Sequence, residues 1–362
     1  MIEREIIRQF LRAHQASPVG ATPPRPVALP DDESVGESQY TLDVERDLSR
    51  WAPIILDEAP AASGEYPEWF VDGSHVGQPV LCVRSPQGYP IPLLIAEVGA
   101  VGLRLQGRRF VRAFTAVDRV LGFVGEPFAW QDVEEFTAAM MNLPDFALRV
   151  LLARLPDKNI HSWFDYEAMR QQVYNRCQNE MLKLEVLALE AAPNLPTLVD
   201  GQLGGRIGEH TAAARPLIVG AVKSPRPPAF PPPGHATILN LKAGQRTPYY
   251  RDARPSDVAL ASWFLRLAGG PRLAPNWGIV RIDIPWVQLC RYTEGAARSG
   301  FVNRLSRWLI DARCRVESYA RMPISIDPIV RAEDALKPLM TPIPVLVNRL
   351  YRTAGLFRGD ES

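Results

Sequence analysis

The chain has 362 residues, of which 46% are hydrophobic and 22% charged, with 41 Lys and Arg against 40 Asp and Glu. This composition is that of a globular protein, and the net charge of +1 excludes a histone-like polycation, so any nucleic-acid site has to be a local patch. Pro occurs 34 times, which argues against a purely helical bundle. Residues 1–15 are charged and amphipathic, and no stretch approaches a membrane span, so we expect a cytoplasmic protein without membrane contact.

The first half of the chain predicts a helix, a Pro-rich arm, three strands and two long helices. Apolar residues at helical spacing mark the helices, and short apolar runs bounded by turn residues mark the strands. In chain order these are a helix over 2–11, the arm over about 15–40, strands over 69–72, 79–85 and 91–105 with a hairpin turn at 87–90, and helices over 133–155 and 166–192.

The second half predicts more strands and a helical end. Strands are expected over 195–200, 215–224, 235–242 and 278–286, with helices over 256–268, 302–320 and 329–340. The Pro-rich run 225–234 is expected as a surface loop, or as a loop that docks a partner or flanks the substrate. Together these elements predict an α/β fold, a mixed sheet with flanking helices and long Pro-rich loops. We expect an N-terminal helix and arm over 1–45, one domain over 46–345 and a tail over 346–362.

The most informative signal is an apolar strand followed by Asp-Gly, which occurs twice. The pairs are Asp72-Gly73 and Asp200-Gly201. If both aspartates end neighbouring strands, their carboxylates come within reach of one hard divalent cation, such as Mg²⁺ or Mn²⁺. The plainer interpretation is ordinary turn chemistry, for which Asp-Gly is common.

A third acidic ligand is expected from the preceding helix. That helix carries Glu180, Glu185 and Glu190. The five-residue separation of Glu180 and Glu185 is a rotation of about 500°, so these two do not share one face. Arg176 lies four residues before Glu180 and is placed to orient it, although an ordinary solvated ion pair explains the same spacing. Lys223, near a predicted strand end, is a candidate for contact with a phosphate, or else a solvated strand terminus.

The segment GQRTPYYR mixes basic and aromatic side chains. Arg246, Tyr249 and Arg251 therefore suit single-stranded nucleic acid, in which bases stack and phosphates attract cations. The alternative is that these side chains simply pack in the protein.

These pieces resemble the NurA family of nucleases and occur in that family's order. They are FVDGS at 70–74, the R-xxx-E spacing at 176–180, LVDGQL at 198–203, IVGAVKS at 218–224, ILNLKAGQRTPYY at 238–250, the stretch 263–286 and the stretch 319–337. The ordered set covers about three-quarters of the chain.

The resemblance implies an RNase H-like core over 46–345 and a DNA nuclease dependent on Mn²⁺ or Mg²⁺. It also implies a homodimer that works with a HerA-type hexameric ATPase in DNA end processing or phage defence. Carried over position by position, Asp72, Asp200 and Glu180 would be metal ligands, and Lys223 would lie on the phosphate side of the site.

The sequence departs from the family pattern near its end. The family commonly closes with Tyr-Pro and then Ala-His, where this chain has Met322-Pro323 and Ala332-Glu333-Asp334. Glu333 or Asp334 is then the candidate for the last ligand, and Glu185 is the alternative to Glu180.

The resulting hypothesis is metal-dependent hydrolysis of phosphodiester bonds in DNA ends or single strands. Three alternatives stay open: a non-catalytic DNA-binding or scaffold protein of the same fold, an RNase H-like enzyme acting on RNA or hybrids, and a structural adaptor.

Overall fold

The computed structural model describes ten stretches of the chain. They are residues 2–19, 40–42, 44–56, 66–155, 164–223, 230–253, 258–269, 276–292, 295–315 and 325–356. Most of the Pro-rich arm, residues 224–229 of the second Pro-rich run, and Met322-Pro323 lie outside the described residues. Within the described residues, no helix is both long enough and apolar enough to cross a membrane.

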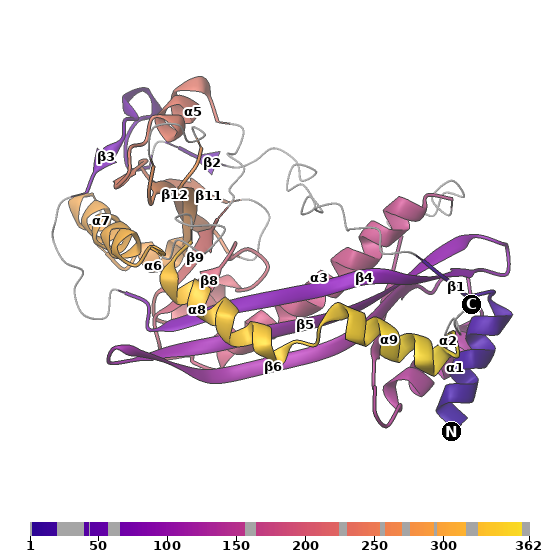
Figure 1. Cartoon of the computed structure of the whole chain (residues 1–362). Coiled ribbons are helices and arrows are strands. Elements are labelled where there is room, and N and C mark those ends of the chain that lie inside the picture. Colours follow the sequence, from indigo (N-terminus) through magenta and orange to yellow (C-terminus); the bar gives the residue numbers. More distant parts are fainter. Residues whose placement is uncertain are drawn as a thin grey trace.

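Three long antiparallel strands form the spine of the molecule (Figure 1). They are β4 (Trp69–Arg84), β5 (Pro90–Gln106) and β6 (Arg109–Val124). The β4–β5 hairpin closes as predicted, since Gly88 takes a φ of +86° that few residues other than glycine adopt. The long strand β6 was not predicted, because its arginine-rich first half lacks an apolar run.

Further strands extend the sheet on both sides. The described strands form one mixed sheet of thirteen strands, with the main order β2-β11-β12-β13-β9-β8-β4-β5-β6-β7. The pairs β4–β8, β8–β9 and β6–β7 are parallel, and the other pairs along this order are antiparallel. The additional strands are β1 (Ser17–Pro18), β2 (Tyr40–Thr41), β3 (Ile54–Ile55), β7 (Arg149–Ala153), β8 (Thr197–Asp200), β9 (Ile218–Val222), β10 (Gln245–Arg246), β11 (Tyr250–Asp252), β12 (Leu260–Arg266) and β13 (Ile279–Pro285).

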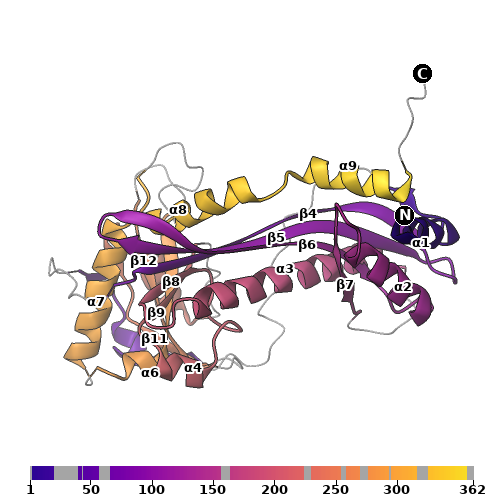
Figure 2. The ribbon, with the colours of Figure 1, turned by 90° about the horizontal axis from the view of Figure 1, so that it is seen from below.

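Helices cover both faces of this sheet. The longest, α3 (Tyr166–Glu190), runs along one face, and α8 and α9 run along the other (Figure 2). Asp165 fixes the start of α3, because its carboxylate accepts a hydrogen bond of 2.9 Å from the N–H of Ala168. The other helices are α1 (Ile2–Ala13), α2 (Trp130–Met141), α4 (Glu209–Ala214), α5 (Pro232–Leu239), α6 (Trp286–Leu289), α7 (Ala296–Asp311), α8 (Asp327–Leu336) and α9 (Ile343–Ala354), with short 3₁₀ turns at Leu48–Arg50 and Lys337–Leu339.

The apolar core is divided along the length of the spine. One cluster fills the end where β4–β6 pack against α1, α2, α9 and the first half of α3. A second lies between α7, α8 and the strands β8, β9, β12 and β13. Between them, residues 73–78 of β4 are only half-buried.

The mixed α/β class with flanking helices is confirmed, but three predicted elements are wrong. Residues 149–153 form β7 rather than the end of a helix, and 260–266 form β12 rather than a helix. Six of the seven residues of β12 are buried, and a run that is apolar on every side cannot be separated from a buried helix by periodicity. Residues 232–239 form α5 instead of a loop and a strand, because proline is tolerated in the first turn of a helix.

Candidate active site

Asp72 and Asp200 lie side by side on neighbouring parallel strands. Val71 of β4 is level with Val199 of β8, so the next residue of each strand occupies the same level of the sheet. Residues at one level of a parallel pair point to the same face. A side-chain hydrogen bond joins the two carboxyls. The fold therefore brings together two aspartates that are far apart in the sequence.

Only one of the two Asp-Gly pairs ends a strand. β8 stops at Asp200, and Gly201 turns the chain with a φ of +95°. β4 instead continues through Gly73, which pairs with Ala100 of β5, so the prediction that Asp72 ends a strand is wrong. Gly73 has a different use, because a Cβ at this position would collide with the carboxylate of Glu185.

Glu185 of α3 is the third carboxylate of the group. It accepts a hydrogen bond from the backbone N–H of Gly73, and its side chain is only 3% exposed. Its Oε2 atom lies 2.6 Å from Nη2 of Arg206, in the loop that follows β8. Its charge acts on Asp72 together with that of Asp200. We call Asp72, Glu185 and Asp200 the carboxylate cluster.

Lys223 stands directly beside the carboxylate cluster. It follows β9, in which Ala221 is level with Asp200, and so it projects from the same face two residues further along. Its Nζ atom lies 2.8 Å from Oδ2 of Asp200, and its side chain is 11% exposed. The structure places this ammonium group next to the two aspartates, and its contact with a phosphate stays a prediction.

Burial and mutual repulsion disfavour the charged forms of the carboxyl groups in the carboxylate cluster. Burial, and then the charge of Asp200, raise the pKa of the Asp72 carboxyl well above its ordinary value, although Lys223 opposes this. Burial also raises the pKa of Glu185, against the opposing charge of Arg206. Like charges packed away from water favour a proton or a cation between them. Carboxyls with pKa values raised in this way are common at functional sites.

Glu180 does not belong to this group, and Glu185 takes its expected place. The two glutamates lie on different faces of α3, and Glu180 receives Arg149 and Lys183 at 2.8 and 2.7 Å, and Arg176 as well. Burial alone would raise its pKa, but these hydrogen bonds outweigh burial and lower the pKa to about 2. Glu180 is therefore part of an ion-pair network that joins α3 to β7.

Glu333 and Asp334 both lie in α8, on the helical face near Lys337. The lysine Nζ is 3.3 Å from Glu333 and 3.4 Å from Asp334. Neither carboxylate is among the main charges that act on Asp72. The structure thus pairs both residues with a cation of their own helix, and their role as a last ligand stays a prediction.

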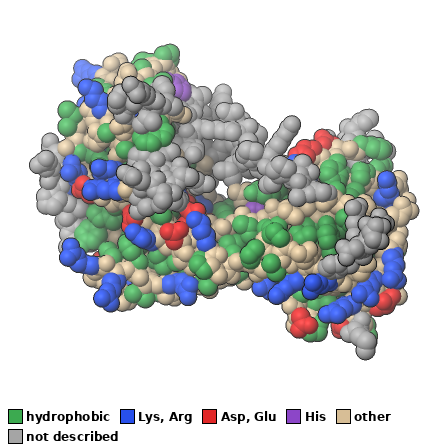
Figure 3. Space-filling view, in the orientation of Figure 1, with side chains coloured by type: hydrophobic (Ala, Val, Ile, Leu, Met, Phe, Trp, Pro, Cys, Tyr) green, Lys and Arg blue, Asp and Glu red, His purple; other side chains and the backbone are tan. Residues whose placement is uncertain are grey.

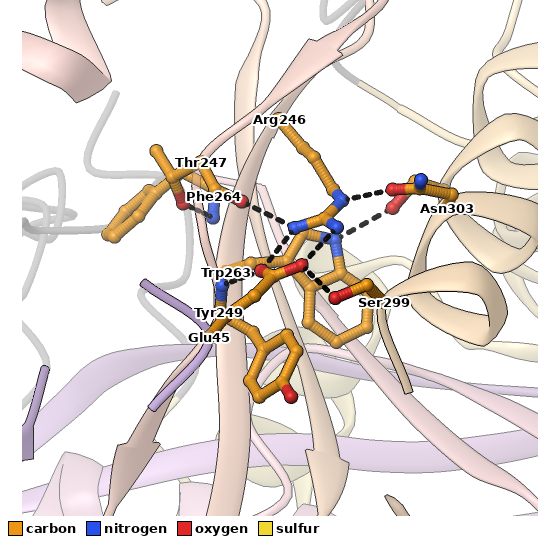
Figure 4. Close-up of polar contacts among 9 residues, drawn as sticks. Glu45, Arg246, Thr247, Tyr249, Trp263, Phe264, Ser299 and Asn303 are labelled. Carbon is orange, nitrogen blue, oxygen red and sulfur yellow. Dashed lines mark hydrogen bonds and ion pairs between the residues drawn. The ribbon is translucent and has the colours of Figure 1, made fainter. Parts of the chain in front are cut away.

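Arg246 and Tyr249 are buried, and their expected contact with DNA is wrong. Arg246 is 0% exposed, and its two Nη atoms donate to the two carboxylate oxygens of Glu45, both at 2.7 Å (Figure 4). Its Nε atom donates to Asn303 at 2.7 Å. Tyr249 is 2% exposed, and its backbone N–H donates to Glu45 at 2.8 Å. These groups fasten the segment around Glu45 to β10 and α7.

Arg251 differs from these two because it is only half-buried. Its guanidinium lies 5.6 Å from the ring centre of Trp286, which also carries Arg298 at 5.8 Å. Contact of Arg251 with nucleic acid stays a prediction.

The carboxylate oxygens of the cluster suit a hard divalent cation, but two of the three carboxylates already form ion pairs with basic side chains. Mg²⁺ and Mn²⁺ prefer carboxylate oxygen, which all three residues supply. In the part of the chain that the structure describes, no three His, Cys, Asp or Glu side chains form a preassembled metal-binding group. Asp200 is paired with Lys223, and Glu185 with Arg206. The residues fit a cation in kind, and its binding requires these ion pairs to loosen.

Comparison with known proteins finds no match by sequence and a remote one by structure. No family model matches the chain, and no curated protein matches its sequence. Among solved structures, the NurA nuclease from Sulfolobus solfataricus is similar over 85% of this chain and 90% of that one, with 11% identity and a TM-score of 0.44. Similarity at this level says nothing about activity, and the chemistry of the site has to be judged from its own side chains.

Proposed function

We propose that this protein is a nuclease that hydrolyses phosphodiester bonds of DNA ends or single strands with the help of Mn²⁺ or Mg²⁺. The observation that carries the proposal is the meeting of Asp72, Glu185 and Asp200 from three separate elements, two of them almost fully buried. A group of like charges that raises the pKa of its own members costs stability, which favours a binding role for it. The ordered sequence motifs support the same reaction class.

The three carboxylates would hold the cation, and Lys223 would contact the phosphate of the substrate. A bound divalent cation polarises a phosphate and lowers the pKa of an attacking water. Asp72 and Asp200 are held by adjacent strands, so the backbone hydrogen bonds of the sheet fix their relative position. Lys223 orients Asp200 through their ion pair and carries the charge that a phosphate oxygen needs.

The proposal extends to the partners that the sequence motifs imply. The protein would act as a homodimer fed with DNA by a HerA-type hexameric ATPase, in DNA end processing or phage defence. A net charge of only +1 supports delivery of DNA by a partner over unaided tight binding. Lys and Arg side chains along the lower edge of the face in Figure 3 offer local positive charge for a DNA backbone.

The test is cleavage of labelled DNA by variants that keep the fold. We expect Mn²⁺-dependent cleavage by the native protein, and a loss of at least about a hundredfold in Asp72→Asn and Asp200→Asn. Asp118→Asn is the matched control, because Asp118 pairs with Arg149 outside the cluster. Native cleavage by the two folded cluster variants would contradict the proposal.

A non-catalytic DNA-binding role is the alternative, and one observation favours it. The carboxylates are already paired with Lys223 and Arg206, as they would be in a site that no longer takes a cation. DNA binding without cleavage under any divalent cation would establish this role. A substrate panel with RNA and hybrids completes the test, since preference for either over DNA would replace the proposed substrate.

A further inference from the structure

Arg206 is the cation that the structure places on the third carboxylate. Its Nε atom donates to Oε2 of Glu185 at 2.8 Å, and its Nη1 atom donates to the carbonyl of Gln202. The arginine side chain is 10% exposed and the glutamate side chain 3%. The pair is thus a shielded ion pair at the edge of the carboxylate cluster, and its arginine lies outside the motifs that predicted the site.

The carboxylate cluster and the ion-pair network of Glu180 differ in their balance of negative and positive charges. Around Glu180, two carboxylates (Glu180 and Asp118) meet three cations (Arg149, Arg176 and Lys183), so positive charge is in excess. The carboxylate cluster has three carboxylates and two cations, Lys223 and Arg206. In the cation-free protein the proton shared by Asp72 and Asp200 balances the remaining charge, and a divalent cation in its place would bring one positive charge more. It would then make one of the resident cations superfluous.

We propose that Arg206 is a displaceable counter-ion of the metal site: it neutralises Glu185 in the cation-free protein and is released toward the substrate phosphate when a divalent cation binds. This inference rests on the proposed function, because it presupposes a cation at Glu185. Arg206 is then a positioning residue that sets cation affinity through Glu185. After release, the guanidinium of Arg206 can form a bidentate pair with a phosphate of the substrate.

The loop that carries Arg206 is built for such a rearrangement. Gly201 and Gly205 both adopt a positive φ, of +95° and +75°, on the two sides of the segment that holds Gln202. The guanidinium lies close against Gly201, where a Cβ would come within 3.2 Å of Nη1. Leu203 meanwhile is fully buried in the adjoining apolar cluster and anchors the loop to the sheet. The arginine can change partner while the loop stays attached.

The test is a calorimetric titration of the full chain with Mn²⁺, which needs no catalytic turnover. Arg206→Gln removes the competing charge but keeps a hydrogen-bonding side chain, and we expect it to bind Mn²⁺ about tenfold more tightly than the native protein, because the cation no longer has to displace a guanidinium from Glu185. Arg206→Lys keeps the charge and is expected to bind like the native protein. Arg176→Gln is the matched control, because it removes an arginine from a glutamate of the same helix outside the cluster.

A double-mutant cycle with Glu185→Gln shows whether Arg206 acts through Glu185. The gain from Arg206→Gln is expected to disappear in the Glu185→Gln background, since the released ligand is then absent. A gain that persists there, or weaker Mn²⁺ binding by Arg206→Gln, would overturn the inference. Absence of Mn²⁺ binding by the native protein would instead contradict the proposed function itself, so the two failures are distinguishable.

A second measurement, of DNA affinity, tests whether the released arginine contacts the substrate. With uncleaved DNA in Ca²⁺, Arg206→Gln is expected to bind about tenfold more weakly than the native protein, although its affinity for Mn²⁺ is higher. Opposite changes in the two affinities are what displacement predicts. A purely structural role would lower both, and that result would also overturn the inference.

Discussion

Replacement of Arg246 by alanine should destabilise the fold rather than weaken a DNA contact. The guanidinium is fully buried and makes two hydrogen bonds of 2.7 Å to Glu45, one of 2.7 Å to Asn303 and one of 2.9 Å to the carbonyl of Thr247. Removing it leaves Glu45, whose side chain is 5% exposed, as a buried carboxylate without its cation. Ser299 and the backbone of Tyr249 still donate to Glu45, but neither carries charge.

The expected cost is about 3–5 kcal/mol, the range found when one partner of a buried ion pair is removed. The pair holds together segments that are 201 positions apart, so its loss should also loosen the chain around Glu45. Replacing both partners with apolar residues, as in Glu45→Leu with Arg246→Met, should recover most of this free energy, because no unpaired charge remains. Urea unfolding followed by tryptophan fluorescence measures the stability of both variants.

Arg251→Ala is the control, because this half-buried arginine rests on Trp286 and its removal should cost less than about 1 kcal/mol. Unfolding of Arg246→Ala at the native urea midpoint, combined with a loss of DNA binding, would refute the structural role and restore the sequence hypothesis.

Three further predictions concern the carboxylate cluster. Because the pKa of Asp72 is raised in the folded protein, the folded state keeps a proton that the unfolded chain has lost, and the stability of the cation-free protein should fall as pH rises above the ordinary aspartate pKa. Asp72→Asn should flatten this dependence in urea unfolding at pH 5 to 8 and stabilise the cation-free protein at pH 7 by about 1–2 kcal/mol; a lower stability than native would contradict this. Glu185→Gln should weaken Mn²⁺ binding in calorimetry while Glu180→Gln leaves it unchanged, and the reverse result would return Glu180 to the site. Gly73→Ala should displace the Glu185 carboxylate and reduce Mn²⁺ affinity with little change in melting temperature, whereas native affinity would show that Glu185 is not held there.

The pairing of the two aspartates was predictable because it depends on local signals. Each follows an apolar run that forms a strand, and the fold places β4 next to β8 in parallel. The choice between Glu180 and Glu185 was not predictable from the sequence, because it depends on which face of α3 packs against the sheet. That face is set by tertiary contacts such as the hydrogen bond of 3.0 Å from the Trp69 indole to the carbonyl of Ala188.

Arg246 shows a different limit of sequence reasoning. A basic residue three and four positions before two tyrosines has the composition of a nucleic-acid site, and only its partner reveals the structural role. That partner, Glu45, is 201 positions away, and spacing along the chain says nothing about such a pair. Gly73 is a similar case. Its lack of a side chain leaves room for the carboxylate of Glu185, which comes from a helix far along the chain, and it does not form a turn.

The central claim is that Asp72, Glu185 and Asp200 jointly hold one divalent cation. Anomalous diffraction from crystals soaked in Mn²⁺ tests it most directly. We expect a peak at about 2.0–2.3 Å from oxygens of all three carboxylates, with Arg206 turned away from Glu185. A peak at another site, or none while Lys223 and Arg206 keep their ion pairs, would contradict the account.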